Sequence, residues 1–141
     1  MIMKRITIIV LLLVLLLSAC SSGLGSKDTP NLDGTSWTMV EIYGKRALTT
    51  TEVWISFDSN QVGGKGGCNH YGGEVKMNAN GNIEFGMLAM TEMYCMEDGV
   101  SDQEFEYFQA LDETRTYHVS GGNLFMLNVD GKAILEFAPR Q

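Results

Sequence analysis

The residues that could carry chemistry lie between Gly63 and Met96. Cys68 stands two residues before His70, Cys95 lies further along, and methionines recur at every third position: Met87, Met90, Met93 and Met96. Three chemistries are open to these groups. The cysteines could form a disulfide, Cys68 could be a nucleophile with His70 as its base, or the sulfur atoms could hold a soft metal such as Cu(I).

The disulfide is the simplest of the three chemistries. A pair of cysteines in an exported protein meets oxidising conditions, and oxidation would remove a thiol nucleophile. In the chain-entropy model, a bridge that closes a loop of about 28 residues stabilises a protein by roughly 3–4 kcal/mol. We therefore expect Cys68 and Cys95 to be bonded, and we expect no catalytic residue, metal or cofactor.

Copper binding is kept as an alternative. Thioethers and thiolates select Cu(I), which favours a site built from the four methionines beside Cys95, with Cys68 and His70 as further ligands. However, a spacing of three places successive residues on opposite faces of a strand, and methionine also fills irregular cores.

Glycine is concentrated around Cys68. Six of the eleven residues from 63 to 73 are glycine. A phosphate-binding loop needs Ser or Thr after Gly-Lys, and here Gly66 follows Gly64 and Lys65. The pattern instead predicts close backbone approach, or bulges in a strongly bent strand.

The amino-terminal residues resemble a bacterial lipoprotein signal. Lys4 and Arg5 precede an apolar run over residues 6–17, and Leu-Ser-Ala then leads into Cys20. We expect residues 1–19 to be a signal peptide and Cys20 to carry palmitate-like acyl chains that hold the protein on a membrane. An ordinary signal peptide that ends in cysteine is the alternative. By resemblance to known lipoproteins, Ser21 after the cysteine implies the periplasmic side of the outer membrane if the cell is Gram-negative.

Composition indicates one globular domain behind this leader. The chain has 141 residues, of which 45% are apolar and 19% charged, with a net charge of −7. Without Lys4 and Arg5 the charge is −9, and such an acidic surface repels phosphate backbones, so no nucleic-acid partner is expected. Residues 20–31 are small and polar and should form a flexible tether.

The rest of the chain reads as strands with one helix. Alternation, glycine turns and the Asn80-Gly81 pair predict strands at 36–43, 52–58, 61–65, 68–77, 83–85, 115–119, 124–129 and 133–137. Phe105, Phe108 and Leu111 recur at helical spacing over residues 101–111, with Ser101 and Glu104 in a capping-box arrangement. The expected fold is mainly β with one α-helix, a small antiparallel β-barrel-like or strongly curved sheet packed with that helix.

Several motifs together resemble the META domain family. They are Leu-Asp-Gly-Thr-Ser-Trp from residue 32, Gly-Cys-Asn-x-Tyr from residue 67, and Leu-Ala-Met-Thr-x-Met-x-Cys from residue 88. The resemblance covers about residues 32–139. It implies a mainly antiparallel β fold, paired cysteines at Cys68 and Cys95, and a cell-envelope setting loosely linked to stress or antibiotic tolerance. The family has no established catalytic residues, so the resemblance assigns none here.

The expected function is therefore a non-catalytic binding or structural role in the cell envelope, with lipid on Cys20 as the membrane anchor. The partner would be an envelope protein or a small ligand. Trp54, on the strand face opposite Val53, Ile55 and Phe57, is a candidate contact residue. The alternative for Trp54 is burial on a strand that is covered on both faces. A related function for the whole protein is inhibition of a lytic enzyme.

Overall fold

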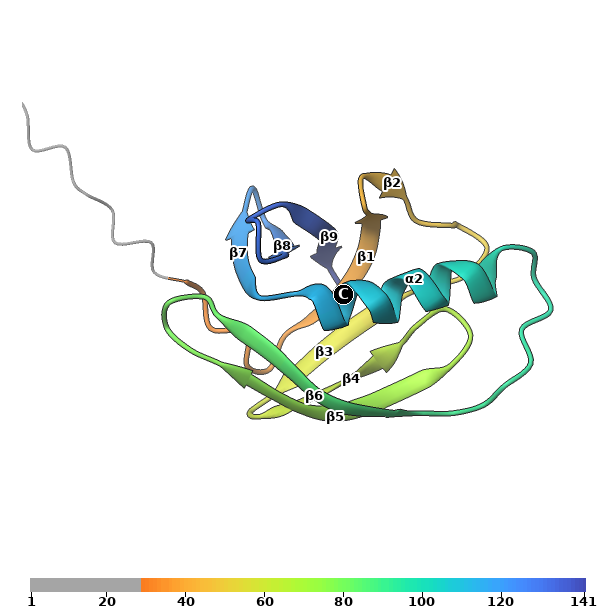
Figure 1. Ribbon diagram of the computed structural model, residues 1–141, viewed down its shortest axis with the longest axis horizontal. Coiled ribbons are helices and arrows are strands. Elements are labelled where there is room, and N and C mark those ends of the chain that lie inside the picture. The colour runs from red at the N-terminus through yellow and green to blue at the C-terminus, as the bar shows by residue number, and fades with distance from the viewer. Residues whose placement is uncertain (1–28) are drawn as a thin grey trace, which may run out of the picture.

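The computed structural model describes residues 29–141 (Figure 1). The expected signal peptide, Cys20 and residues 20–28 of the expected tether lie outside the described residues. Residues 29–31 lie against the domain, where the Tyr117 hydroxyl donates a hydrogen bond of 3.3 Å to the Pro30 carbonyl. Within residues 29–141, no helix is long and apolar enough to cross a membrane.

Nine strands and one helix make up this part of the chain. The strands are β1 (Ser36–Ile42), β2 (Lys45–Arg46), β3 (Trp54–Asp58), β4 (Gln61–Lys65), β5 (His70–Met77), β6 (Ile83–Met90), β7 (Thr116–Ser120), β8 (Asn123–Leu127) and β9 (Ala133–Pro139). The helix is α2 (Val100–Glu113), which lies between β6 and β7 in the sequence.

All nine strands form a single antiparallel sheet. Eight of them follow the order β6-β5-β4-β3-β1-β9-β8-β7, and β2 pairs with β1 beside this path. The sheet curls around α2, so that β6 and β7 approach each other at their first residues (Figure 1). There Asn82 pairs with Thr116, and Tyr117 donates its N–H to the Gly81 carbonyl. The prediction of a strongly curved sheet packed with one helix is confirmed.

The core fills the concave side of this curl. Val53, Ile55 and Phe57 of the β3 segment are 2%, 0% and 1% exposed, which confirms the predicted inward face. The largest fully buried side chains come from both halves of the sheet and from the helix: Tyr107, Phe57, Phe137, Leu32, Ile55, Leu111, Leu124, Met126 and Leu135. One helix therefore serves as the second layer for the whole sheet.

The predicted helix is present, but the predictions of its capping residue and of its buried face were wrong. Gly99, with φ of 77°, precedes the first helical residue, and no side chain of the described residues caps this end. Ser101 lies inside the helix. Phe105 is 73% exposed, whereas Tyr107 is completely buried. The buried stripe consists of Val100, Gln103, Glu104, Tyr107, Ala110 and Leu111, whose spacing is also helical.

Two differences concern the strands around the glycines. β6 continues to Met90, five residues beyond the predicted strand over 83–85, and β5 begins at His70 rather than Cys68. The predicted close backbone approach is found where β4 pairs with β3. A Cβ atom on Gly64 would overlap the carbonyl oxygen of Trp54, so only glycine fits at this position.

Candidate functional site

A buried polar cluster joins the turn before β5 to the helix. One oxygen of Glu104 accepts hydrogen bonds from the backbone N–H groups of Cys68 (3.1 Å) and Asn69 (2.6 Å). Its other oxygen accepts a bond of 2.7 Å from the Asn69 side-chain amide. Glu104 is only 8% exposed, and these three donors satisfy the carboxyl group without a cation.

The same Asn69 side chain holds the segment that follows β6. Its Oδ1 atom accepts hydrogen bonds from the Thr91 hydroxyl at 2.9 Å and from the Met93 backbone N–H at 2.7 Å. Thr91 in turn accepts a bond of 3.1 Å from the His70 N–H. Asn69 therefore links Glu104 of the helix to the segment over residues 91–93.

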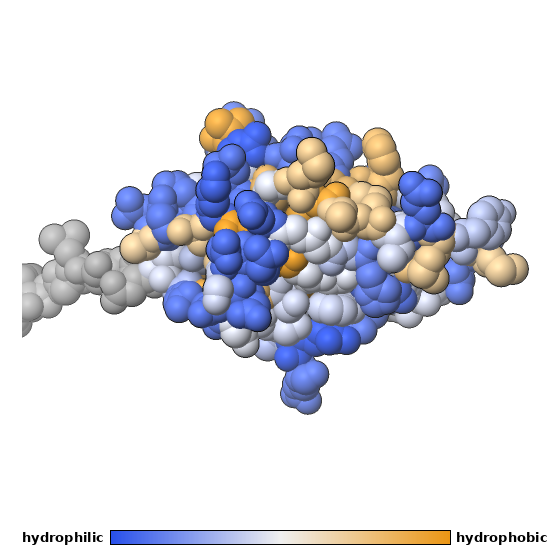
Figure 2. All heavy atoms as spheres, turned by 90° about the horizontal axis from the view of Figure 1, so that it is seen from below, coloured by the Kyte–Doolittle hydropathy of each residue, from blue (hydrophilic) through white to orange (hydrophobic). Residues whose placement is uncertain are grey.

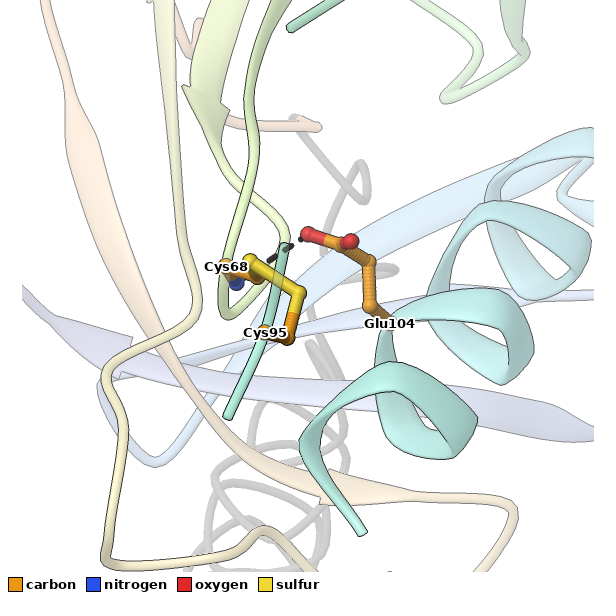
Figure 3. A group of neighbouring side chains, drawn as sticks. All are labelled: Cys68, Cys95 and Glu104. Atoms are coloured by element: carbon orange, nitrogen blue, oxygen red, sulfur yellow. Dashed lines mark hydrogen bonds between the residues drawn. A yellow bond between two sulfur atoms is a disulfide. The ribbon is translucent and has the colours of Figure 1, made fainter. Parts of the chain in front are cut away.

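The disulfide lies beside this network, as Figure 3 shows together with Glu104. Cys68 and Cys95 are bonded, with 5.7 Å between their Cα atoms. The disulfide expected from the sequence is thus present in the structure. The two sulfur atoms and a Glu104 oxygen lie within 4.8 Å of one another, which resembles a metal-binding group. Because the sulfurs share a bond, neither is a thiolate that could bind a metal or act as a nucleophile.

Two glycines allow the helix to come this close to the turn. A Cβ atom on Gly66 would lie 2.8 Å from a Glu104 oxygen and 2.9 Å from the Phe108 ring. Gly67 has φ of 131°, in the region that favours glycine. The glycine-dense stretch therefore serves the contact between the turn and the helix. We call the network of Cys68, Asn69, Thr91, Cys95 and Glu104 the clamp.

A second group of side chains forms a row on the convex face of the sheet. In the pairing register, Thr38 lies opposite Trp54, Trp54 opposite Lys65, and Lys65 opposite His70. Opposite residues share a face of the sheet, so these four side chains lie side by side across β1, β3, β4 and β5. We call them the outer row. Trp54 is only partly exposed, and its ring meets the His70 ring edge-on at 6.5 Å.

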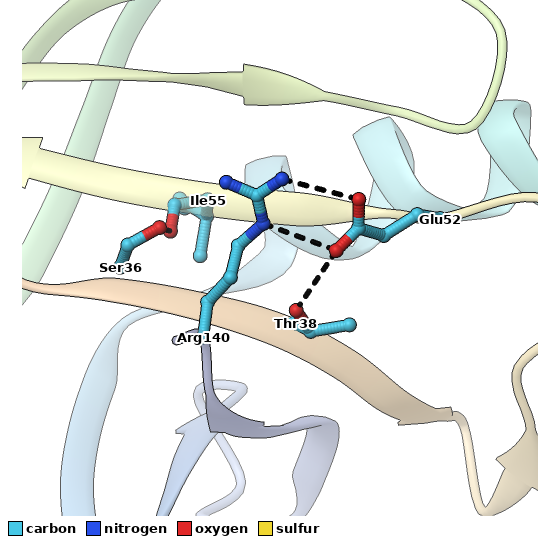
Figure 4. A network of polar contacts seen from close by, with 5 residues as sticks. All are labelled: Ser36, Thr38, Glu52, Ile55 and Arg140. Carbon is cyan, nitrogen blue, oxygen red and sulfur yellow. Dashed lines mark hydrogen bonds and ion pairs between the residues drawn. The ribbon is translucent and has the colours of Figure 1, made fainter.

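Arg140 covers Trp54 from the carboxyl end of the chain. Its guanidinium carbon lies 4.5 Å from the centre of the Trp54 ring, a cation–π contact. The same guanidinium donates to both Glu52 oxygens at 3.0 and 3.2 Å, and Thr38 donates to Glu52 at 3.3 Å (Figure 4). The hydrogen bond from Arg140 lowers the pKa of Glu52 and raises the pKa of Arg140. Arg140 and Glu52 thus hold the outer row in place.

A surface hollow of about 460 Å³ connects the outer row to the clamp. Its lining includes Lys65 from the row, Glu52 beside the row, both cysteines, and Tyr94 and Met96 from the loop after β6. The disulfide joins this loop to the turn between β4 and β5, so the bond forms part of the wall of the hollow. Cationic, acidic, aromatic and thioether groups all meet here.

The structure also places the other candidate residues. His70 and His118 are both exposed, as expected for surface strand residues. Met87, Met90, Met93 and Met96 are 95%, 47%, 56% and 83% exposed, so none of them fills the core. Glu104 was missed as part of the cluster because it was interpreted as a capping residue. The contribution of Arg140 has no local signal in the sequence.

The fold and the clamp together define a class of protein, a small disulfide-bridged domain whose single curled sheet wraps one helix. The META domain family model matches residues 30–141, and the chain belongs to this family. No curated protein matches the sequence.

Solved structures share the fold at low sequence identity. The NMR structure of a protein from Burkholderia xenovorans is similar with a TM-score of 0.64 and 22% identity, over 86% of this chain and 97% of that chain. The crystal structure of a DUF4847 family protein from Bacteroides vulgatus has a TM-score of 0.55 and 13% identity, over 76% of this chain and 93% of that chain. At these identities the likeness concerns the fold alone.

Proposed function

We propose that this protein is a lipid-anchored, non-catalytic binding module of the cell envelope and that the outer row is its contact surface. The observation that carries the proposal is the arrangement of Trp54 between Lys65 and Thr38, with Arg140 above its ring. An aromatic side chain held rigidly on a sheet face, between a cation and a hydroxyl group, is suited to anchor a ligand.

The position of the hollow beside the outer row is consistent with a protein that is anchored at its amino-terminal end. The first described residues lie near β7, while the loop that carries Cys95 lies at the other end of the long axis (Figure 1). Lipid on Cys20 would therefore hold one end of the domain and present the hollow beside Lys65 away from the membrane. The disulfide supports export, because such bonds persist in oxidising compartments.

The test compares Trp54→Ala with Phe125→Ala in the full mature lipoprotein. Phe125 is a matched control, because its ring also contacts a histidine of a neighbouring strand, His118, with 5.1 Å between ring centres. Photocrosslinking in native envelopes should capture a protein, lipid or cell-wall fragment with the unchanged chain and with Phe125→Ala. Trp54→Ala should reduce capture about tenfold. Equal capture by both variants would contradict the assignment of the outer row.

Copper binding is the second candidate, and the exposure of the four methionine side chains favours it. With both cysteines bonded, a Cu(I) site would depend on thioethers alone. Titration of the oxidised protein with Cu(I) against a competing chelator tests this function. Binding that is lost when all four methionines become leucine would support it, and the absence of competition would exclude it.

A further inference from the structure

The edge strand β6 has open backbone groups. It stands at one end of the sheet order and pairs with β5 on one side only. At its first residue, Ile83 donates its N–H to the Arg115 carbonyl, so the chain itself occupies the edge at that point. Beyond Ile83, no strand within residues 29–141 pairs with this side of β6.

The hydrogen bond from the Thr91 N–H to the His70 carbonyl shows which groups are open. In an antiparallel pair, opposite residues alternate between pairs that exchange both backbone bonds and pairs that exchange none. Ala89, two residues before Thr91, therefore bonds to β5. Leu88 and Met90 direct their N–H and C=O groups away from β5, and these groups have no backbone partner in the described part of the chain.

The open edge is short. The β5–β6 register shifts between Gly73 and Val75, which places a bulge in β6 just before Leu88. Bulges bend an edge strand and hinder the stacking of copies along it. The edge over residues 88–90 therefore suits one short extended segment, which would use four backbone hydrogen bonds.

Apolar side chains surround this edge. Eight large hydrophobic side chains are exposed in residues 29–141, and six of them come from residues 87–105: Met87, Met90, Met93, Tyr94, Met96 and Phe105. Figure 2 views the molecule from the side of β5 and β6. Hydrophobic atoms, in tan, gather toward the right of this face, and the rest of the face is mostly white or blue, that is, intermediate or hydrophilic. Methionine-rich surfaces adapt to differently shaped partners.

The exposed side of α2 borders the same edge. Phe105, Phe108 and Asp112 share one face of the helix by their spacing. Phe108 packs against Tyr71 of β5, with 5.3 Å between ring centres. Asp112 lines a surface hollow together with Glu84 and Phe85 of β6. A strand added to β6 would therefore meet this helix face as well.

The charge of this region is uniformly negative. Residues 83–114 contain no Lys, Arg or His and hold nine acids: Glu84, Glu92, Glu97, Asp98, Asp102, Glu104, Glu106, Asp112 and Glu113. In the rest of the described chain, seven acids balance seven Lys and Arg residues. Residues 83–114 thus carry the whole net charge of the described domain. Three cations of other segments border them: Lys45 lies 3.7 Å from Glu106, Lys76 lies opposite Glu84 in the strand pairing, and Arg115 donates to the Asp112 carbonyl.

We propose that the open edge of β6, at residues 88–90, binds an extended basic segment of a partner protein as an added strand. The open backbone groups require an extended chain, because only an extended chain presents matching groups at the spacing of a strand. The acids select Lys and Arg in the partner. A second copy of this chain is disfavoured, since pairing β6 with β6 would bring two negatively charged segments together.

The probe is the labelled peptide Lys-Lys-Val-Thr-Val-Thr-Val-Lys-Lys, measured by fluorescence anisotropy with the full mature protein in detergent. We expect saturable binding that weakens as salt increases. The same peptide with Glu in place of Lys, and the Lys peptide with alternate backbone nitrogens methylated, should each bind at least about tenfold more weakly. These two comparisons need no change to the protein.

A pair of variants locates the site. Met90→Pro removes an N–H that points away from β5 and should weaken binding about tenfold, whereas Met90→Ala removes only the side chain and should weaken it less than about threefold. Equal binding of the methylated peptide, equal binding of the Glu peptide, or no binding of the Lys peptide at millimolar concentration would overturn the proposal. A salt-resistant dimer that Met90→Pro dissociates would overturn it in favour of a second copy.

Discussion

Asn69 and Glu104, 35 residues apart in the sequence, are joined by two hydrogen bonds across the junction between β5 and α2. The backbone N–H of Asn69 donates to one carboxyl oxygen and its side-chain amide donates to the other. This pairing ties the helix to the curled sheet, because the carboxyl group is buried and its three donors come from the turn before β5.

Replacing Glu104 should destabilise the domain strongly. In Glu104→Ala, the N–H groups of Cys68 and Asn69 lose their acceptor inside the protein, and the free energy of unfolding should fall by about 2–4 kcal/mol. Glu104→Gln should cost less, about 1–2 kcal/mol, because its amide nitrogen would face the Asn69 amide. Urea denaturation measures both values.

Glu106→Gln is the control for these two variants. Glu106 lies on the same helix but is partly exposed, and its one ion pair within residues 29–141, with Lys45, is a surface contact. Its replacement should change the free energy of unfolding by less than about 0.5 kcal/mol. Similar losses at positions 104 and 106 would show that the clamp does not stabilise the domain.

The disulfide should contribute a comparable amount. Cys68→Ser together with Cys95→Ser should lower the free energy of unfolding by about 3–4 kcal/mol, since the bond joins two residues that are 27 positions apart and so restricts the unfolded chain. Calorimetry should also show a lower melting temperature for the protein treated with a reducing agent than for the untreated protein. An unchanged melting temperature, or two free thiols in the mass spectrum of unreduced protein, would refute the bond.

The lipid anchor gives a prediction about localisation. Cys20→Ala should move the protein from the membrane pellet to the soluble fraction, because the acyl chains contribute about 0.8 kcal/mol for each buried methylene. Fractionation in high salt measures this change. Cys95→Ser is the control, because it removes a cysteine from the folded domain and should leave the protein in the pellet. A Cys20→Ala protein that still pellets would exclude lipid as the anchor.

Local pattern was sufficient to predict most of the strands. The alternation of Val53, Ile55 and Phe57 determines an inward face whatever lies across the sheet, and the glycines around Gly64 indicate close backbone approach. The disulfide was predictable as well, because export restricts the chemistry that two remaining cysteines undergo.

The orientation of the helix was not predictable from its own residues. Two stripes have helical spacing, one through Phe105 and Phe108 and the other through Val100, Tyr107 and Leu111, and packing against the sheet selects the second. The same limit applies to the outer row. Glu52 and Arg140 meet across 88 positions because β1 pairs with both β3 and β9, and such contacts leave no local signal.

The buried tyrosine pair gives a prediction about alkaline stability. The hydroxyls of Tyr71 and Tyr107 lie 2.6 Å apart inside the core. Desolvation by burial raises the pKa of both groups well above 10. Above about pH 10 the unfolded chain loses these protons and the folded chain keeps them, so the folded state binds more protons. The stability that is fully present below pH 10 should therefore be lost as pH rises further.

Urea denaturation between about pH 9 and pH 11.5 measures this slope. Each retained proton contributes up to about 1.4 kcal/mol per pH unit. The double variant Tyr71→Phe with Tyr107→Phe removes both groups and should reduce the slope, although packing changes will shift the overall stability. Burial also raises the pKa of Tyr43 and of Tyr117, so these two groups should leave a smaller slope of the same sign. Tyr94→Phe, which changes a side chain that is 89% exposed, should leave the slope as it is. If the double variant keeps the full slope, the loss of stability arises from other groups, and the two hydroxyls ionise alike in the folded and unfolded chains.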